Sequence, residues 1–245
     1  METVARATAD GYTLLSASVG LVATATALRK VPFDTNAAFD PVLRMTAQPY
    51  IVVVNPAVAI HSMQELIAYA KANPAKLTFG AGSTSSRAAG ELMKTMAGID
   101  MLHVPYRSNP LVVTDLLGGQ ISLFFGDVST SLPPVRGGQL KGFAVSSLKR
   151  SPLAPDLTSL DEAGLKGYDL TAWFAAFAPA RTPKPIVDRL NAAFREALAD
   201  NDVSAKLNAA GIEPVASSPE ELKDFVISET KKWAKIVADA KIEPE

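Results

Sequence analysis

The sequence predicts an α/β protein with a sheet that is largely parallel and covered by helices. Three observations lead to this class. Short apolar segments alternate with segments of helical periodicity through the middle of the chain. The connections between them are short, and parallel strands need such helical crossovers. Ile51-Val52-Val53-Val54 is a β-branched run without a polar residue, which is typical of a strand buried on both faces.

The N-terminal elements are short. Residues 2 to 9 are typical of the end of a helix, and Asp10-Gly11 then predicts a turn. The apolar segment Tyr12 to Leu15 predicts a strand after that turn.

The middle of the chain supplies the βα units. Ser62-Met63-Gln64-Glu65 is a capping box that opens a helix, and Asn73-Pro74 ends it. Leu77 to Phe79 predicts a strand, and a helix follows that ends at Gly98. The later elements repeat this pattern, with strands predicted at Met101–Tyr106, Ile121–Phe125 and Phe143–Val145 and helices at Pro110–Leu117 and Thr130–Arg136.

The C-terminal part has a different character. Tyr168 to Phe177 is long and apolar, and three prolines follow between Pro179 and Pro185. Residues 186 to 199 and 219 to 240 then predict two long amphipathic helices. The change indicates that the chain leaves the βα region near residue 178.

Composition excludes several classes of protein. Lys and Arg number 24 against 25 Asp and Glu, and no run of basic residues occurs, so a nucleic-acid partner is not predicted. The chain has no Cys and only two His, which excludes thiolate chemistry and leaves no metal motif. No stretch of eighteen apolar residues is present, so we expect no membrane insertion. We expect no cofactor, and no nucleophile–base pair indicates an enzyme.

The loop Gly82 to Ser86, with residues Gly82, Ser83, Thr84, Ser85 and Ser86, is the strongest candidate site. It follows a strand and precedes a helix. A helix N-terminus presents unpaired N–H groups to an anion, and the hydroxyls add further donors. The interpretations left open are a carboxylate or phosphate site and an ordinary helix cap.

A dinucleotide site is the alternative use of the same loop. Gly80-x-Gly82-x-x-Ser85 approximates the G-x-G-x-x-G fingerprint without its third glycine. The acidic ribose partner is absent at the end of the next strand, where Tyr106-Arg107 stands instead.

Three further side chains are candidates for ligand contact. Asp127 follows a predicted strand and could accept a hydrogen bond from a ligand, or it could cap the next helix. Tyr106 ends another strand. Trp173 could line a cleft, with core packing as the alternative.

Several motifs resemble one family, the solute receptors of tripartite tricarboxylate transporters, also called the Bug or TctC family. Asp10-Gly11-Tyr12-Thr13-Leu14-Leu15 is similar to its D-G-Y-T-L-L, and His103-Val104-Pro105-Tyr106 to its H-V-P-Y. The remaining motifs occur in the same order: Asn73 to Gly80, Thr114 to Gln120 (T-D-L-L-G-G-Q) and Phe177 to Pro183 (F-A-P-A-x-T-P).

The resemblance implies a two-lobe periplasmic binding protein of type II, a Venus-flytrap fold with a mostly parallel sheet flanked by helices in each lobe. Residues 48–177 would form one complete lobe, and 1–47 with 178–245 the other. It implies capture of a small carboxylate between the lobes, hinge closure, and transfer to membrane subunits of a transporter by a monomeric, periplasmic receptor. A di- or tricarboxylate, an acidic amino acid or an aromatic acid are the expected ligands.

The resemblance also carries over site residues. The second lobe would contribute Gly82 to Ser86 with Asp127 opposite, and the first lobe Ser16 and Ser18 after its strand. The family's signal sequence, first strand and P-F-P-P-G-G loop are absent from this sequence, so we expect a first lobe that is incomplete at its N-terminus. The family's frequent Asp-Asn is Gly126-Asp127 here. An NADP-dependent oxidoreductase and a degenerate member that binds nothing are the alternative functions.

Overall fold

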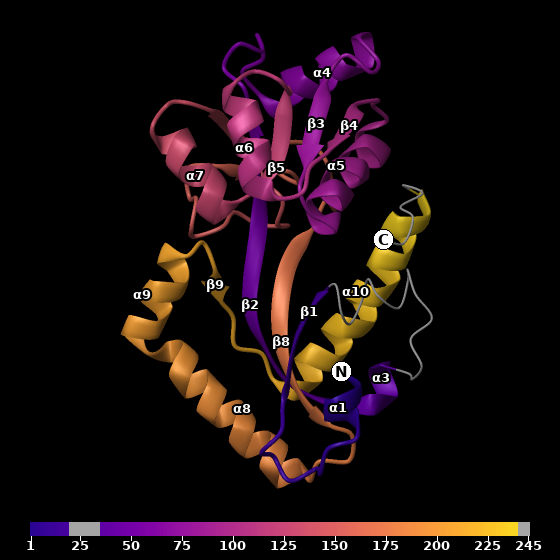
Figure 1. Cartoon of the computed structure of the whole chain (residues 1–245), viewed down its shortest axis with the longest axis vertical. Coiled ribbons are helices and arrows are strands. Elements are labelled where there is room, and N and C mark those ends of the chain that lie inside the picture. The colour runs from indigo at the N-terminus through magenta and orange to yellow at the C-terminus, as the bar shows by residue number, and fades with distance from the viewer. Residues whose placement is uncertain (20–34, 240–245) are drawn as a thin grey trace. The chain divides into compact units, whose positions relative to one another are not determined.

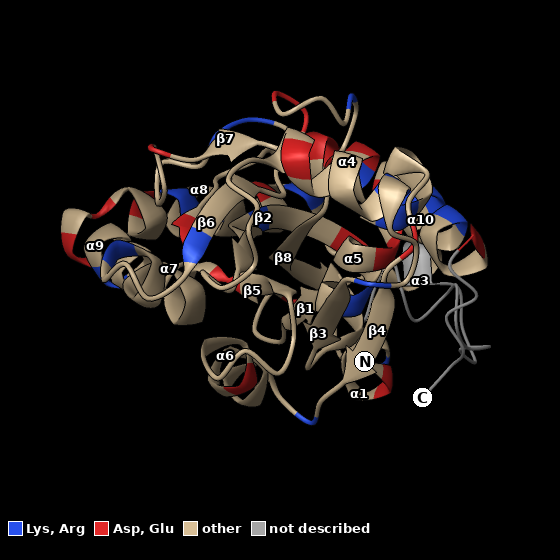
Figure 2. Ribbon diagram, turned by 90° about the horizontal axis from the view of Figure 1, so that it is seen from above, with Lys and Arg blue, Asp and Glu red and all other residues tan. Residues whose placement is uncertain are grey.

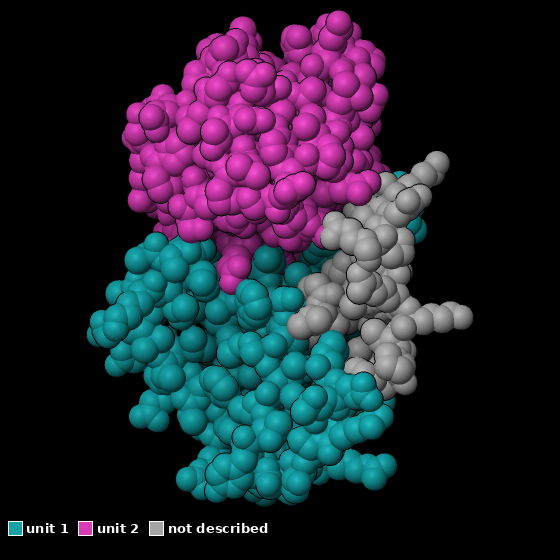
Figure 3. All heavy atoms as spheres, viewed as in Figure 1, with its two compact units in different colours: residues 1–47, 172–245 teal, residues 48–171 magenta. Residues whose placement is uncertain are grey.

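A computed structural model describes residues 1–19 and 35–239 (Figure 1). The chain divides into two compact units, coloured separately in Figure 3. Unit 1 comprises Met1–Ala47 and Ala172–Glu245, and unit 2 comprises Gln48–Thr171. Strands β2 (Phe39–Val54) and β8 (Thr171–Pro179) run from one unit into the other along the chain.

Unit 2 is built around six strands in the order β4-β3-β5-β2-β6-β7. Strand β3 is parallel to β4 and β5, and β6 is parallel to β7, whereas β2 is antiparallel to both of its neighbours in this unit. Its strands besides β2 are β3 (Thr78–Ala81), β4 (Leu102–Pro105), β5 (Leu123–Asp127), β6 (Lys141–Val145) and β7 (Thr158–Ser159). Its helices are α4 (Met63–Ala72), α5 (Thr84–Ala97), α6 (Asn109–Leu117) and α7 (Val128–Arg136).

The core of unit 2 lies on both faces of this sheet. Residues Ile51 to Val54 have no exposed surface, which confirms the strand predicted there to be buried on both faces. One face carries an apolar cluster in which Val112 and Leu116 of α6 pack with Phe124 of β5. Helix α5 packs closely against strand β3, and a side chain at Gly90 would collide with the Phe79 ring.

His103 of β4 contributes an unpaired polar group to this core. Its ring centroid lies 5.2 Å from that of Phe79, and Nε2 is buried with no hydrogen-bond partner among the residues that the structure describes. Burial, as the largest cause, and the positive charges of Arg87 and Lys94 together lower the pKa of His103 to about 4. The imidazole is therefore neutral in the folded protein around neutral pH.

Unit 1 has a smaller sheet in the order β1-β8-β2-β9, with β1 (Leu15–Ser18) and β9 (Glu213–Pro214) as its new strands. Strand β1 is antiparallel to β8, and β9 is antiparallel to β2. The expectation of a mostly parallel sheet in each lobe is therefore wrong for these pairs. Segments that come from distant parts of the sequence need no helical crossover, so nothing forces them to run parallel.

The helices of unit 1 are α1 (Glu2–Ala5), α3 (Thr35–Ala38), α8 (Lys184–Ala199), α9 (Asn201–Ala209) and α10 (Pro219–Asp239). Side chains of α8 pack on the apolar cluster that contains Ala176 and Ala178 of β8. Trp173 of the same strand contacts Phe225 of α10, with ring centroids 5.3 Å apart. Since side chains alternate along a strand, α8 and α10 cover opposite faces of β8.

A buried carboxylate joins α10 to this strand. Glu229 is 3% exposed and accepts hydrogen bonds from the indole N–H groups of Trp173 (2.9 Å) and Trp233 (3.3 Å). Lys232 supplies the opposite charge. Helix α10 carries both acidic and basic residues (Figure 2).

Candidate functional site

The site in unit 2 is built where three strands reach the same edge of the sheet. Strand β3 ends at Ala81 and the parallel strand β5 ends at Asp127, so the segments that follow them lie at one edge. The antiparallel strand β2 enters the unit at this edge, with Tyr50 directly opposite Asp127. The edge at the carboxyl ends of parallel strands is where open α/β sheets bind ligands.

Residues 82–86 form the turn into helix α5, and two of their hydroxyls serve that turn. Ser83 is the N-cap, and its hydroxyl accepts the N–H of Ser86 at 3.2 Å. Ser86 is fully buried, and its hydroxyl donates to the Ser83 carbonyl. Thr84 and Ser85 are the first helical residues, where backbone N–H groups have no acceptor within the helix. The cap interpretation thus applies to Ser83 and Ser86.

Ser85 has a different partner. The Tyr50 hydroxyl donates a hydrogen bond to Ser85 Oγ at 2.8 Å. Because Tyr50 occupies one lone pair of this oxygen, the Ser85 proton is directed elsewhere. Burial raises the pKa of Tyr50 to about 12, so its hydroxyl remains a donor throughout the physiological range.

Asn109, the first residue of α6, links the loop to Asp127. Its Oδ1 accepts the Gly82 N–H at 3.1 Å, and its Nδ2 donates to Asp127 Oδ2 at 2.6 Å. The two segments are close enough that a Cβ on Gly82 would lie 2.1 Å from the Ser108 carbonyl carbon. Glycine is therefore required at position 82 by close approach of two backbones.

Asp127 occupies the N-cap position of α7 but makes no side-chain cap hydrogen bond. Its carboxylate is half-buried and directed to Asn109 instead. The alternative that Asp127 is a helix cap is therefore wrong.

Tyr106 lies at the end of β4, and its hydroxyl donates to Asp115 Oδ2 on α6 at 2.8 Å. Its side chain packs against the core cluster on that face. Burial and this hydrogen bond raise the pKa of Tyr106 to about 12. Its hydroxyl thus serves the packing of α6.

The candidates in unit 1 form a separate group. Ser16 is exposed and Ser18 is half-buried, and both lie within β1, opposite Ala176 and Phe174. The strand predicted at residues 12 to 15 is therefore displaced, because the Asp10 side chain accepts the N–H of Tyr12 and prolongs the turn. Trp173 has no exposed surface, so the structure favours its alternative role in core packing.

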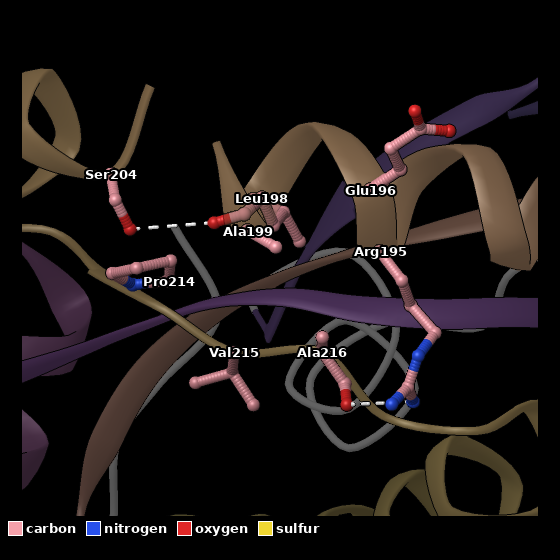
Figure 4. Close-up of a pocket in the computed structure, with 8 residues that line it drawn as sticks. All are labelled: Arg195, Glu196, Leu198, Ala199, Ser204, Pro214, Val215 and Ala216. Carbon is pink, nitrogen blue, oxygen red and sulfur yellow. Dashed lines mark hydrogen bonds between the residues drawn. The ribbon is translucent and has the colours of Figure 1, made fainter. Parts of the chain in front are cut away.

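Two surface hollows lie apart from these residues. One of about 560 Å³ is in unit 1, where the end of α8 faces α9 and the segment after β9 (Figure 4). Two of the polar side chains drawn there bond within the protein: Arg195 donates to the Ala216 carbonyl, and Ser204 donates to the Leu198 carbonyl. The other, of about 420 Å³, lies against α4 and the end of α5 in unit 2.

Sequence reasoning did not assign Tyr50 and Asn109 to the site. Both contact candidates that it did assign, namely Ser85, Gly82 and Asp127. Each lies next to a proline, in Pro49-Tyr50 and Asn109-Pro110, at the start of a strand segment or helix. That local position was the only signal, and it does not identify a partner.

Among the described residues no group of His, Cys, Asp or Glu could hold a metal, and no helix is long and apolar enough to cross a membrane.

The fold is that of solute-binding proteins of the periplasmic type. The profile of the "Tripartite tricarboxylate transporter family receptor" matches residues 1–242. The chain belongs to this family, as its motifs predicted. The family consists of periplasmic binding proteins that serve tripartite transporters.

Curated relatives agree with this assignment. The "UPF0065 protein in tcbD-tcbE intergenic region" of Pseudomonas sp. strain P51 is 33% identical over 242 residues, covering 98% of this chain and 72% of that protein. BugT of Bordetella pertussis is 30% identical over 242 residues, covering 97% of this chain and 74% of the relative.

Solved structures show the same similarity. Rpa4515 of R. palustris, determined with adipate, is 32% identical with a TM-score of 0.79, covering 99% of this chain and 82% of that one. The periplasmic binding protein BugD is 30% identical with a TM-score of 0.76, at 99% and 83% coverage. MatC of Rhodopseudomonas palustris, with bound malate, is 28% identical with a TM-score of 0.74, at 96% and 82% coverage.

Proposed function

We propose that this protein is a solute-binding receptor, without enzymatic activity, that captures a small carboxylate at the edge of unit 2 formed by the ends of β3 and β5. The observation that carries the proposal is the Ser85 hydroxyl at the start of α5, fixed as a donor by Tyr50. A helix N-terminus favours a negative charge, and the hydroxyl adds a directed hydrogen bond.

The solved relatives support the carboxylate class. Rpa4515 was determined with adipate and MatC with malate. We propose the same chemical class for this chain and leave the particular acid to experiment. Delivery to the membrane subunits of a tripartite transporter, action as a monomer in the periplasm, and a contribution of Ser16 and Ser18 to the ligand belong to the same proposal.

The alternative functions predict different ligands. An oxidoreductase would bind NADP through the loop that begins at Gly80. A degenerate member of the family would bind neither NADP nor a carboxylate. Family membership favours the receptor, since the relatives with known structure are binding proteins.

Thermal unfolding with a panel of acids tests the proposal. The panel contains malate, succinate, adipate, citrate, glutamate and benzoate, with NADP as the competing class. A ligand at 100 times its Kd stabilises by about 2.7 kcal/mol, which is about 5–10 °C for a chain of this size. We expect a shift of that order with at least one acid and none with NADP.

The matched variants locate the binding site. Ser85→Ala should weaken the binding of that acid by about 10-fold or more, because hydrogen bonds to charged groups are strong. Ser228→Ala, on exposed α10 surface, should leave it unchanged. A shift with NADP alone, or with no compound, would overturn the proposal.

A further inference from the structure

We propose that Asp127 makes the site selective for carboxylates that also carry a hydrogen-bond donor, an ammonium or hydroxyl group, near the bound carboxylate. The inference rests on the function proposed above and names the ligand class more narrowly. It depends on where the Asp127 carboxylate lies and on what it does not bind.

The first step is that Asp127 does not serve its helix. Residues at N-cap positions ordinarily accept a backbone N–H of the first turn, which stabilises the helix. Asp127 has the N-cap position of α7 and makes no such bond. Its Oδ2 accepts from Asn109, and within the described part of the chain no partner is seen for Oδ1. One carboxylate oxygen therefore remains available.

The second step is that Asp127 faces the carboxylate-binding hydroxyl. Tyr50 and Asp127 are directly opposite in an antiparallel pair, so their side chains share one face with Cβ atoms about 5 Å apart. The Tyr50 hydroxyl on that face reaches Ser85. Burial is the main cause of the raised pKa of Tyr50, and the negative charge of Asp127 adds to it.

The third step is that Asp127 is held close to the loop. Asn109 bonds to both Gly82 N and Asp127 Oδ2, and the amide group between these bonds keeps the two atoms within about 8 Å. A small acid spans that distance. A ligand bound at the start of α5 therefore has Asp127 within reach of its neighbouring carbon atoms.

The chemistry then discriminates between acids. An ammonium or hydroxyl group on the ligand would donate to Asp127, and such charge-assisted bonds are the strong ones. A plain acid offers no proton and leaves the carboxylate desolvated beside a like charge, which disfavours it. Sites that bond a ligand's OH or NH reject the analogue that lacks it far more strongly than apolar pockets reject a missing methylene.

Three acids on one carbon skeleton test this selectivity. L-aspartate, L-malate and succinate differ only in carrying an ammonium, a hydroxyl or a hydrogen at one carbon. Calorimetric titration of the full chain should give succinate a Kd at least about 30-fold weaker than the better of the other two. The pair 2-aminoadipate and adipate repeats the comparison on a longer skeleton, in case the site excludes or admits acids by length.

Two variants show whether Asp127 selects the ligand through its charge or only supports the loop through its bond to Asn109. Asp127→Asn keeps the acceptor for Asn109 and removes the charge, so it should reduce the preference to below about 3-fold, mainly by improving the binding of the plain acid. Asp127→Glu keeps the charge and should keep the order of preference. Should D127N fail to fold, the selectivity is tested on the wild-type protein alone, by the ratio of the Kd of the plain acid to the Kd of the substituted acid on each skeleton.

These experiments distinguish a failure of the proposed selectivity from a failure of the proposed receptor function. Binding of a plain acid as tightly as its substituted partner would overturn the selectivity while leaving the receptor function intact. An unchanged ratio in a folded D127N would do the same. Binding of none of the acids on either skeleton, or in the wider panel, would overturn both.

Discussion

Tyr50→Phe tests the geometry of the site most directly. The change removes one hydroxyl from a side chain that is 3% exposed and leaves the packing of its ring in place. The bond lost is the 2.8 Å contact to Ser85 Oγ. A neutral hydrogen bond of this kind contributes about 0.5–1.5 kcal/mol. Unfolding should therefore occur about 2–5 °C lower in temperature.

The effect on binding follows from the Ser85 proton. Without Tyr50 the Ser85 hydroxyl is no longer oriented, so part of its bond to the ligand carboxylate is lost. We expect Y50F to weaken binding by about 2- to 10-fold, with the tighter of malate and adipate as the probe. Ser85→Ala should cost more, since it removes the donor itself.

A double-mutant cycle shows whether the two residues act together. If Tyr50 acts only through Ser85, then Y50F should have almost no further effect on affinity in the S85A background. The stability of each variant, measured by urea unfolding, separates folding from binding. Equal losses from Y50F in both backgrounds would refute the reasoning, because Tyr50 would then act on the ligand by another route.

Two further predictions concern stability. The pKa of His103 is lowered to about 4 in the folded protein, so the unfolded chain takes up a proton below its ordinary pKa near 6.5 while the folded chain does not. The free energy of unfolding should therefore fall as the pH drops from about 6.5 to 4, by about 1–2 kcal/mol once solvent screening is allowed for. In urea titrations, His103→Gln should remove this part of the pH dependence. The control His61→Gln, at an exposed position, should keep it. Glu229→Ala should lower the free energy of unfolding by about 3 kcal/mol or more, because it leaves two buried indole N–H groups without their acceptor and removes the carboxylate that pairs with Lys232. Exposed Glu220→Ala on the same helix is the control, with a loss below about 1 kcal/mol, and equal losses for the two variants would argue against a buried network.

The βα units of unit 2 could be predicted because each carries its own local signals. The capping box at Ser62 gives the helix α4, and Gly98 ends α5 in a left-handed conformation, as expected. The helix α7 contains Pro133 and Pro134 and was still predictable from its flanking residues. In these elements periodicity and end signals agree, so tertiary contacts did not need to be known.

Unit 1 was less predictable for physical reasons. Helix α9 has no buried residue and so no apolar stripe, and only the Asp200 cap marks its start. Strand β2 begins at Phe39, although Pro41 and Pro49 interrupt it and local propensity disfavours a strand there. Packing against strands from distant parts of the chain decided β2.

The site illustrates which part of function local sequence can specify. The loop at Gly82 was visible because glycine and hydroxyl residues between a strand and a helix have a local physical meaning. Tyr50 and Asn109 were not, because their roles arise from the pairing of segments more than 25 residues apart in sequence.

The register between β2 and β5 is the element on which this site depends. It runs without interruption from Tyr50 to Val54, whereas the irregularity in β2 between Val52 and Val53 occurs in its pairing with β6 on the other side. A slip of one residue against β5 would turn every side chain of the strand to the opposite face. Tyr50 would then lose both its contact with Ser85 and its position opposite Asp127. The run that follows Tyr50 is fully buried, so this register links the polar groups that meet at the edge to the apolar core of unit 2.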